Sequence, residues 1–64
     1  MIKYTSRVWT KSVTQQTIKQ LRQAGLTVTK KDSGYECIVG DTMVFKAMNG
    51  TRGYLVRYDE NLFA

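Results

Sequence analysis

The chain has 64 residues, a formal net charge of +5, one cysteine, no histidine and no proline. This length predicts one small domain, residues 1–64, and a 42% hydrophobic content is enough for a packed core. One cysteine excludes an internal disulfide, and a metal site needs several Cys or His ligands, so we expect no metal and no cofactor. No apolar run is long enough for a signal peptide or a membrane span, and a cytoplasmic location without a membrane partner is therefore expected.

Charge is distributed unevenly along the chain. Residues 1–31 carry seven Lys or Arg and no acid, whereas residues 32–64 carry three cations and five acids. Such asymmetry indicates a polyanionic or acidic partner. A surplus of lysine that serves only solubility would give the same composition, so the count alone leaves both interpretations open.

The first predicted element is a strand over residues 2–9. Lys3, Arg7 and Lys11 would repel one another at i, i+4 on a helix, and the intervening residues favour strands. Strand alternation then predicts a core-facing set and an exposed basic set. The core-facing set is Ile2, Tyr4 and Val8, and the exposed set is Lys3, Thr5, Arg7 and Trp9.

A helix is predicted over residues 13–24. Ser12 and Gln15 match the capping box at its start, and Gly25 suits the left-handed position just after its end. One stripe of the helix is apolar or small and is expected to face the core. Its members are Val13, Thr14, Thr17, Ile18, Leu21 and Ala24.

The rest of the chain predicts strands over residues 26–31, 35–39, 42–48 and 54–59, with a four-residue loop at 49–52. Pairing Cys37 with Phe45 places most apolar side chains on one sheet face and sets Glu36 beside Lys46. We therefore predict an α+β domain, one α-helix packed on an antiparallel sheet, in the order β-α-β-β-β with a further strand. The expected core face of the sheet is Leu26, Val28, Tyr35, Cys37, Val39, Met43, Phe45, Val56 and Tyr58.

The opposite sheet face is less polar than solvent exposure requires. Either the C-terminal Leu62 and Phe63 cover it, or it is a surface that contacts a protein. The residues expected on this face are Ile38, Val44, Lys46, Met48, Leu55 and Arg57.

Catalysis has few candidate groups in this sequence. The usual general base is missing, and Cys37 lies on the inward parity of its strand, where a core thiol is the expected role. The paired glycines lack the strand–loop–helix context of a phosphate loop and predict turns. We expect a protein that is not an enzyme and has no small-molecule substrate.

One stretch resembles a known family in layout. The helix ending in "LRQAG" and the strands after it, about residues 12–46, are similar to the opening of the HicA RNA-cleaving toxins. The catalytic histidine of that family has no counterpart here, where the turn reads "SGYEC". The resemblance therefore implies a shared arrangement of elements and carries over no activity.

Two functions remain open. The first is nucleic-acid binding by the acid-free half, in which cations hold phosphates and Trp9 stacks on unpaired bases. The second is a phage-type protein-binding inhibitor or modulator of a host enzyme, docking through the outer sheet face or the basic patch onto an acidic surface. Trp9 could instead complete the core, and the helix glutamines could be an ordinary solvated face. The candidate binding residues are Lys3, Arg7, Trp9, Lys11, Lys19, Arg22, Lys30 and Lys31.

Overall fold

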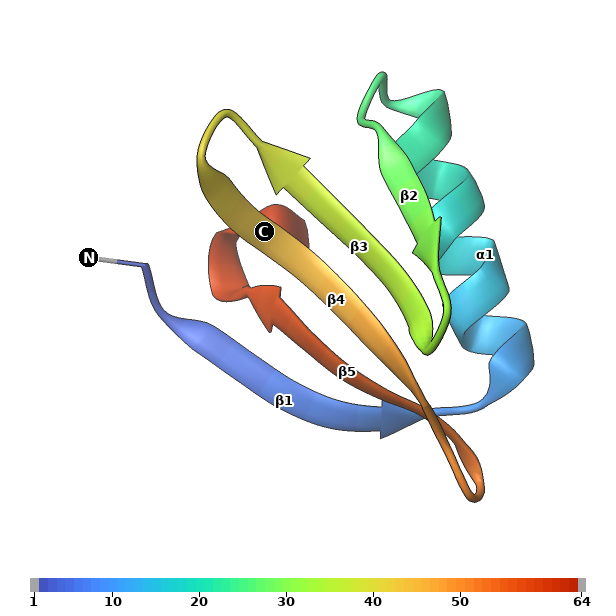
Figure 1. The fold of residues 1–64 in the computed structure, drawn as a ribbon. Coiled ribbons are helices and arrows are strands. Elements are labelled where there is room, and N and C mark those ends of the chain that lie inside the picture. The colour runs from blue at the N-terminus through green and yellow to red at the C-terminus, as the bar shows by residue number, and fades with distance from the viewer. Residues whose placement is uncertain (1, 64) are drawn as a thin grey trace.

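The computed structural model describes residues 2–63 and contains one α-helix and one five-stranded antiparallel sheet. The strand order across the sheet is β1-β5-β4-β3-β2, so α1 crosses from one edge strand to the other (Figure 1). The predicted α+β fold and its element order are confirmed. The elements are β1 (Tyr4–Trp9), α1 (Lys11–Gln23), β2 (Val28–Lys31), β3 (Gly34–Val39), β4 (Thr42–Gly50), β5 (Gly53–Asp59) and the 3-10 turn η1 (Glu60–Phe63).

Helix α1 begins two residues earlier than predicted. Thr10 is the N-cap, and its Oγ1 accepts a hydrogen bond from the backbone N–H of Val13 at 3.2 Å. The predicted capping box of Ser12 and Gln15 is therefore wrong. Thr10 follows β1 directly, and its extended backbone brings the hydroxyl to the free N–H groups of the first turn.

The other end of α1 forms as predicted. Gly25 has a φ of 93°, a conformation that an L side chain disfavours. Its N–H donates to the carbonyl of Arg22 and the N–H of Leu26 donates to the carbonyl of Leu21, both at 3.0 Å. This is the Schellman arrangement, and it turns the chain so that Leu26 packs against the core.

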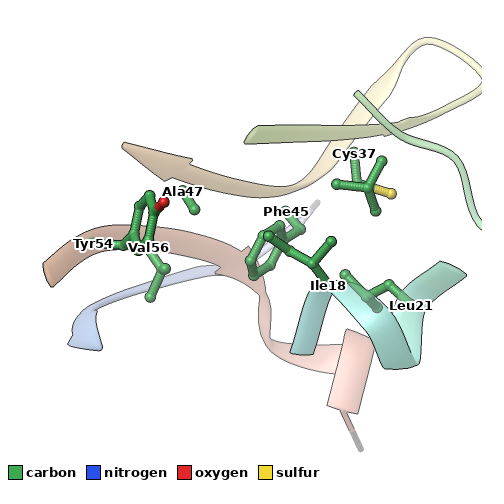
Figure 2. Close-up of a cluster of buried hydrophobic side chains, with 8 residues drawn as sticks. Ile18, Leu21, Cys37, Phe45, Ala47, Tyr54 and Val56 are labelled. Atoms are coloured by element: carbon green, nitrogen blue, oxygen red, sulfur yellow. The ribbon is translucent and has the colours of Figure 1, made fainter. Parts of the chain in front are cut away.

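The core lies between α1 and one face of the sheet (Figure 2). Ile18 and Leu21 come from the helix, and Cys37 meets Phe45 across strands β3 and β4 as predicted. Thr14 is also fully buried, and its Oγ1 donates to the carbonyl of Thr10 at 2.9 Å. The buried hydrophobic residues are Ile18, Leu21, Val28, Cys37, Phe45, Ala47, Tyr54 and Val56.

Strand β1 has the opposite orientation to the predicted one. Trp9 pairs with Tyr54 of β5 and is half-buried against the core, whereas Val8 is 68% exposed on the other face. Ile2 is also exposed, and Tyr4 is half-buried on the outer face. The prediction placed three apolar residues, Ile2, Tyr4 and Val8, on the core-facing side of this strand and only Trp9 on the other side. The larger ring nevertheless takes the core position, because it buries more apolar surface than a Val or Tyr at this edge.

Two details of the β3–β4–β5 pairing also differ from prediction. The register shifts after Cys37, where Ile38 pairs with Met43 and Val44 has no partner in β3. This β-bulge places Val44 against the core and Met43 on the outer face, the reverse of what alternation predicts. The β4–β5 connection is a two-residue turn, not a four-residue loop, so Phe45 pairs with Tyr58.

The C-terminal turn η1 packs on the same side of the sheet as α1. The ring of Phe63 lies 5.1 Å from that of Tyr58 and 6.2 Å from that of Trp9, measured between centroids. Leu62 packs against the same core. The predicted covering of the outer face by these two residues is therefore wrong, and they extend the core toward β1 instead.

Candidate nucleic-acid interface

The predicted binding residues separate into two groups at opposite edges of the sheet. Lys3 and Arg7 belong to the β1 edge, whereas Lys30 and Lys31 lie on β2 at the other edge. With strands about 4.8 Å apart, four strand spacings put about 19 Å between the two edges. The candidate cations of β1 and those of β2 therefore lie at separate edges of the sheet.

An acid lies beside the β1 cations. The N–H of Glu60 donates to the carbonyl of Lys3 at 3.0 Å, and the Oγ1 of Thr5 donates to a carboxylate oxygen of Glu60 at 2.9 Å. A guanidinium nitrogen of Arg7 is 3.5 Å from the carbonyl of Ser6. The β1 edge therefore offers two cations next to a carboxylate that would repel phosphate.

The helix cations lie along one flank of α1. At 100° per residue, positions 11, 15, 19 and 22 fall within a sector of about 80°. Arg22 is held at one end, where its guanidinium donates to the carbonyl of Val28 at 2.8 Å. Toward the other end, the amide nitrogen of Gln15 lies 3.4 Å from the hydroxyl of Tyr35. These two contacts establish that the flank carrying Lys11 and Lys19 faces the β2 edge.

Strand β2 adds one cation to the same side of the molecule. Lys30 pairs with Tyr35 and shares the helix-facing parity of Val28, whereas Lys31 pairs with Gly34 and points to the other face at the strand end. Figure 1 shows α1 running beside β2 along this edge. We name this the helix–β2 basic surface. It consists of Lys11, Lys19, Arg22 and Lys30, all of them exposed. Lys31, on the other face of the sheet, lies outside it.

The surface is hollowed along the helix flank. A shallow hollow of about 560 Å³ is lined by Gln15, Ile18, Lys19, Arg22 and Gln23. The first acid in the chain, Asp32, follows Lys31 in the turn between β2 and β3. Helix α1 itself contains no acid. Backbone phosphates would thus meet cations and amides over most of this side.

Trp9 does not have the environment of a base-stacking platform. Its ring centroid lies 5.5 Å from that of Tyr58 and 6.1 Å from that of Phe45, and Phe63 covers it from the C-terminal turn. The sequence left two roles open for Trp9, stacking on unpaired bases and packing in the core, and the geometry favours packing in the core. Trp9 is therefore withdrawn from the candidate interface.

The outer sheet face carries an apolar row across three strands. Val8, Leu55 and Met48 are cross-strand neighbours and are 68%, 52% and 40% exposed. Beside them, Arg57 pairs with Lys46 across strands β4 and β5. Sequence reasoning missed Val8 because it assigned β1 the wrong parity.

The rest of the outer face surrounds this row. The guanidinium carbon of Arg57 lies 4.7 Å from the centroid of the Tyr4 ring, and Ile38 is exposed. A hollow of about 270 Å³ lies here. Met43 and Ser6 line it together with Lys46, Met48, Leu55, Val56 and Arg57. The bulge in β4 explains why Met43, which was expected in the core, belongs to this face.

Among the described residues, the structure adds no group to the candidate for catalysis considered from the sequence, the thiol of Cys37. Cys37 is fully buried, and its burial raises the pKa of the thiol. Within residues 2–63, no group of three or more His, Cys, Asp or Glu is placed to hold a metal ion. Over the same range, no helix has the length and apolar character needed to cross a membrane.

Comparison with protein-family models, with curated proteins and with solved structures finds no match for this chain. The likeness to the HicA toxins is therefore one of layout alone. In this chain, α1 is followed by antiparallel β2, β3 and β4, and β1 precedes it.

Proposed function

We propose that this protein is a non-enzymatic nucleic-acid-binding protein that holds the sugar–phosphate backbone on the helix–β2 basic surface. The observation that carries the proposal is the convergence of cations from two elements onto one edge. Arg22 is fixed by its hydrogen bond to Val28, and Lys30 shares the helix-facing side of β2 with that residue. No acid interrupts α1.

The physical basis is counterion release. Each phosphate neutralised by Lys or Arg frees condensed cations, so the logarithm of affinity falls linearly with the logarithm of salt concentration. Four clustered cations are enough for binding that depends strongly on salt. Because Trp9 is packed in the core, stacking contributes little, and we expect charge to dominate the affinity.

The test compares two triple variants with the same loss of charge. Lys19→Gln, Arg22→Gln and Lys30→Gln remove cations from the proposed surface. The matched control, Lys3→Gln, Arg7→Gln and Arg52→Gln, removes three exposed cations elsewhere. Affinity for a mixed-sequence DNA is measured by fluorescence anisotropy at several salt concentrations, and circular dichroism establishes that both variants are folded.

We expect the first variant to lose affinity and to reduce the salt slope by about 0.9 for each duplex phosphate contact removed. The control variant should retain most of the affinity and most of the salt slope. Equal losses in the two variants would mean that only net charge matters, and the proposed surface would then be wrong.

A second candidate, docking on a protein partner, is favoured by the apolar row of Val8, Leu55 and Met48 on the outer face. Lys46 and Arg57 beside this row suit a partner whose apolar ridge is bordered by carboxylates. Leu55→Asp separates the two candidates. It should abolish a stoichiometric, nuclease-resistant protein complex in the second case and leave DNA affinity unchanged in the first.

A further inference from the structure

Helix α1 has three different exposed sectors. Its crest, opposite the buried stripe, consists of Gln16, Gln20 and Gln23 at spacing i, i+4, i+7, all of them exposed. The flank toward β2 carries the cations. The opposite flank carries Val13 and Thr17 and no charge. A merely solvated helix needs no such division, because mixed charges on all sides would serve equally well.

We propose that α1 enters the major groove of double-stranded DNA, with the glutamine crest facing the base edges and the cation flank against one phosphate strand. This inference rests on the proposed function. The proposed ligand is duplex DNA, and the glutamine crest is the part of α1 that would contact the base edges. The uncharged flank then lies toward the opposite wall, away from the strand that the cations hold.

The dimensions of α1 match those of the groove. The major groove of B-form DNA is about 12 Å wide and admits an α-helix. At about 1.5 Å per residue, the crest extends about 10 Å from Gln16 to Gln23. This length covers about three base pairs at about 3.4 Å each. Glutamine can donate to N7 and accept from N6 of adenine in a bidentate pair, so the crest has the chemistry to prefer adenine.

Helix α1 is also accessible for this contact. It lies beside β2 at the edge of the sheet, and within residues 2–63 no other element covers its outward side (Figure 1). The C-terminal turn packs toward β1, where Phe63 contacts Trp9. RNA duplexes are disfavoured because their major groove is deep and narrow, so the crest would not meet the bases there.

The experiment compares three duplexes of one sequence. They are unmodified DNA, DNA whose cytosines are replaced by glucosylated 5-hydroxymethylcytosine, and double-stranded RNA. Glucose fills the major groove and leaves the phosphates unchanged. We expect the protein to bind the glucosylated DNA and the RNA about tenfold or more weakly than the unmodified DNA.

A crest variant, Gln16→Ala, Gln20→Ala and Gln23→Ala, supplies the second measurement. Alanine is the better helix former, so the fold is retained. We expect the variant to keep the salt slope of the wild type. We also expect it to lose the preference that the wild type should show for the unmodified DNA over a fourth duplex, which contains only G·C pairs and therefore no adenine. If the wild type binds unmodified and glucosylated DNA equally, with a normal salt slope, the groove inference is wrong and backbone binding stands. If RNA binds as tightly as DNA, the inference is also wrong. If no nucleic acid binds, the proposed function itself fails.

Discussion

Replacing Trp9 with alanine tests the orientation of β1 and the role of the ring together. The Trp9 ring contacts Phe45, Tyr58 and Phe63, with centroid separations of 6.1, 5.5 and 6.2 Å. A fully buried Trp→Ala change costs about 3–5 kcal/mol, and Trp9 is half-buried, so we expect a loss of about 2–4 kcal/mol. A domain of this size has a total unfolding free energy of about 3–10 kcal/mol. The variant should therefore lose a large part of its stability.

Thermal unfolding followed by far-ultraviolet circular dichroism measures the effect. In a small domain about 1 kcal/mol corresponds to about 4–8 °C, so Tm should fall by about 8 °C or more. Val8→Thr is the matched control, because Val8 lies on the same strand, faces outward and keeps a β-branched side chain on substitution. Its Tm should change by no more than about 4 °C. A Trp9→Ala variant that melts with the wild type, yet binds single-stranded DNA less tightly, would refute the core assignment and restore the stacking role.

Three further perturbations test other contacts. Thr10→Ala should lower the free energy of unfolding, measured by urea denaturation, by about 1 kcal/mol because it removes the N-cap. Ser12→Ala should lower it little, and a larger loss for Ser12→Ala than for Thr10→Ala would restore the predicted capping box. Gly53→Ala should destabilise by more than Gly25→Ala, because both have positive φ but only at Gly53 would a methyl group clash with a β1 carbonyl oxygen; equal Tm losses would contradict this close approach. Burial raises the pKa of Cys37, so the unfolded thiol ionises first as pH rises, and stability should fall from about pH 9 upward. A Cys37→Ala variant should lack that alkaline slope, and a slope identical in both proteins would assign it elsewhere.

Much of the fold could be predicted because apolar residues recur at helical spacing over α1 and alternate at strand spacing over most of the strands that follow it. Cys37, Phe45 and Val56 each have one charged neighbour, Glu36, Lys46 and Arg57 respectively, and these charged positions indicate which face of each strand is buried. The bulge in β4 could not be predicted, because Met43 and Val44 are both apolar and either one suits the core. The orientation of β1 was predicted wrongly for a related reason. Both of its faces carry apolar side chains, and the packing of the Trp9 ring against Phe45, Tyr58 and Phe63 selects between them.

The candidate site was harder to predict than the fold. The cations of the first 31 residues were identified correctly as a charge asymmetry, but their grouping depends on strand order, which no local pattern encodes. Arg22 and Lys30 share a surface because α1 folds back along β2 after Gly25. The position of Gly25 predicted where the helix ends, but not that β2 runs back beside it. The placement of β1 at the opposite edge follows only from its pairing with β5.

This topology has an electrostatic consequence for how the molecule meets a polyanion. The two edge strands lie about 19 Å apart, which exceeds two Debye lengths of about 8 Å each at physiological salt. Lys3 and Arg7 therefore act almost independently of Lys30 on β2, and they also lie near the carboxylate of Glu60. The +7 charge of the first 31 residues thus does not act as one field. A phosphate backbone bound on the helix–β2 basic surface would meet four cations, and the β1 cations would contribute mainly to long-range attraction at low salt.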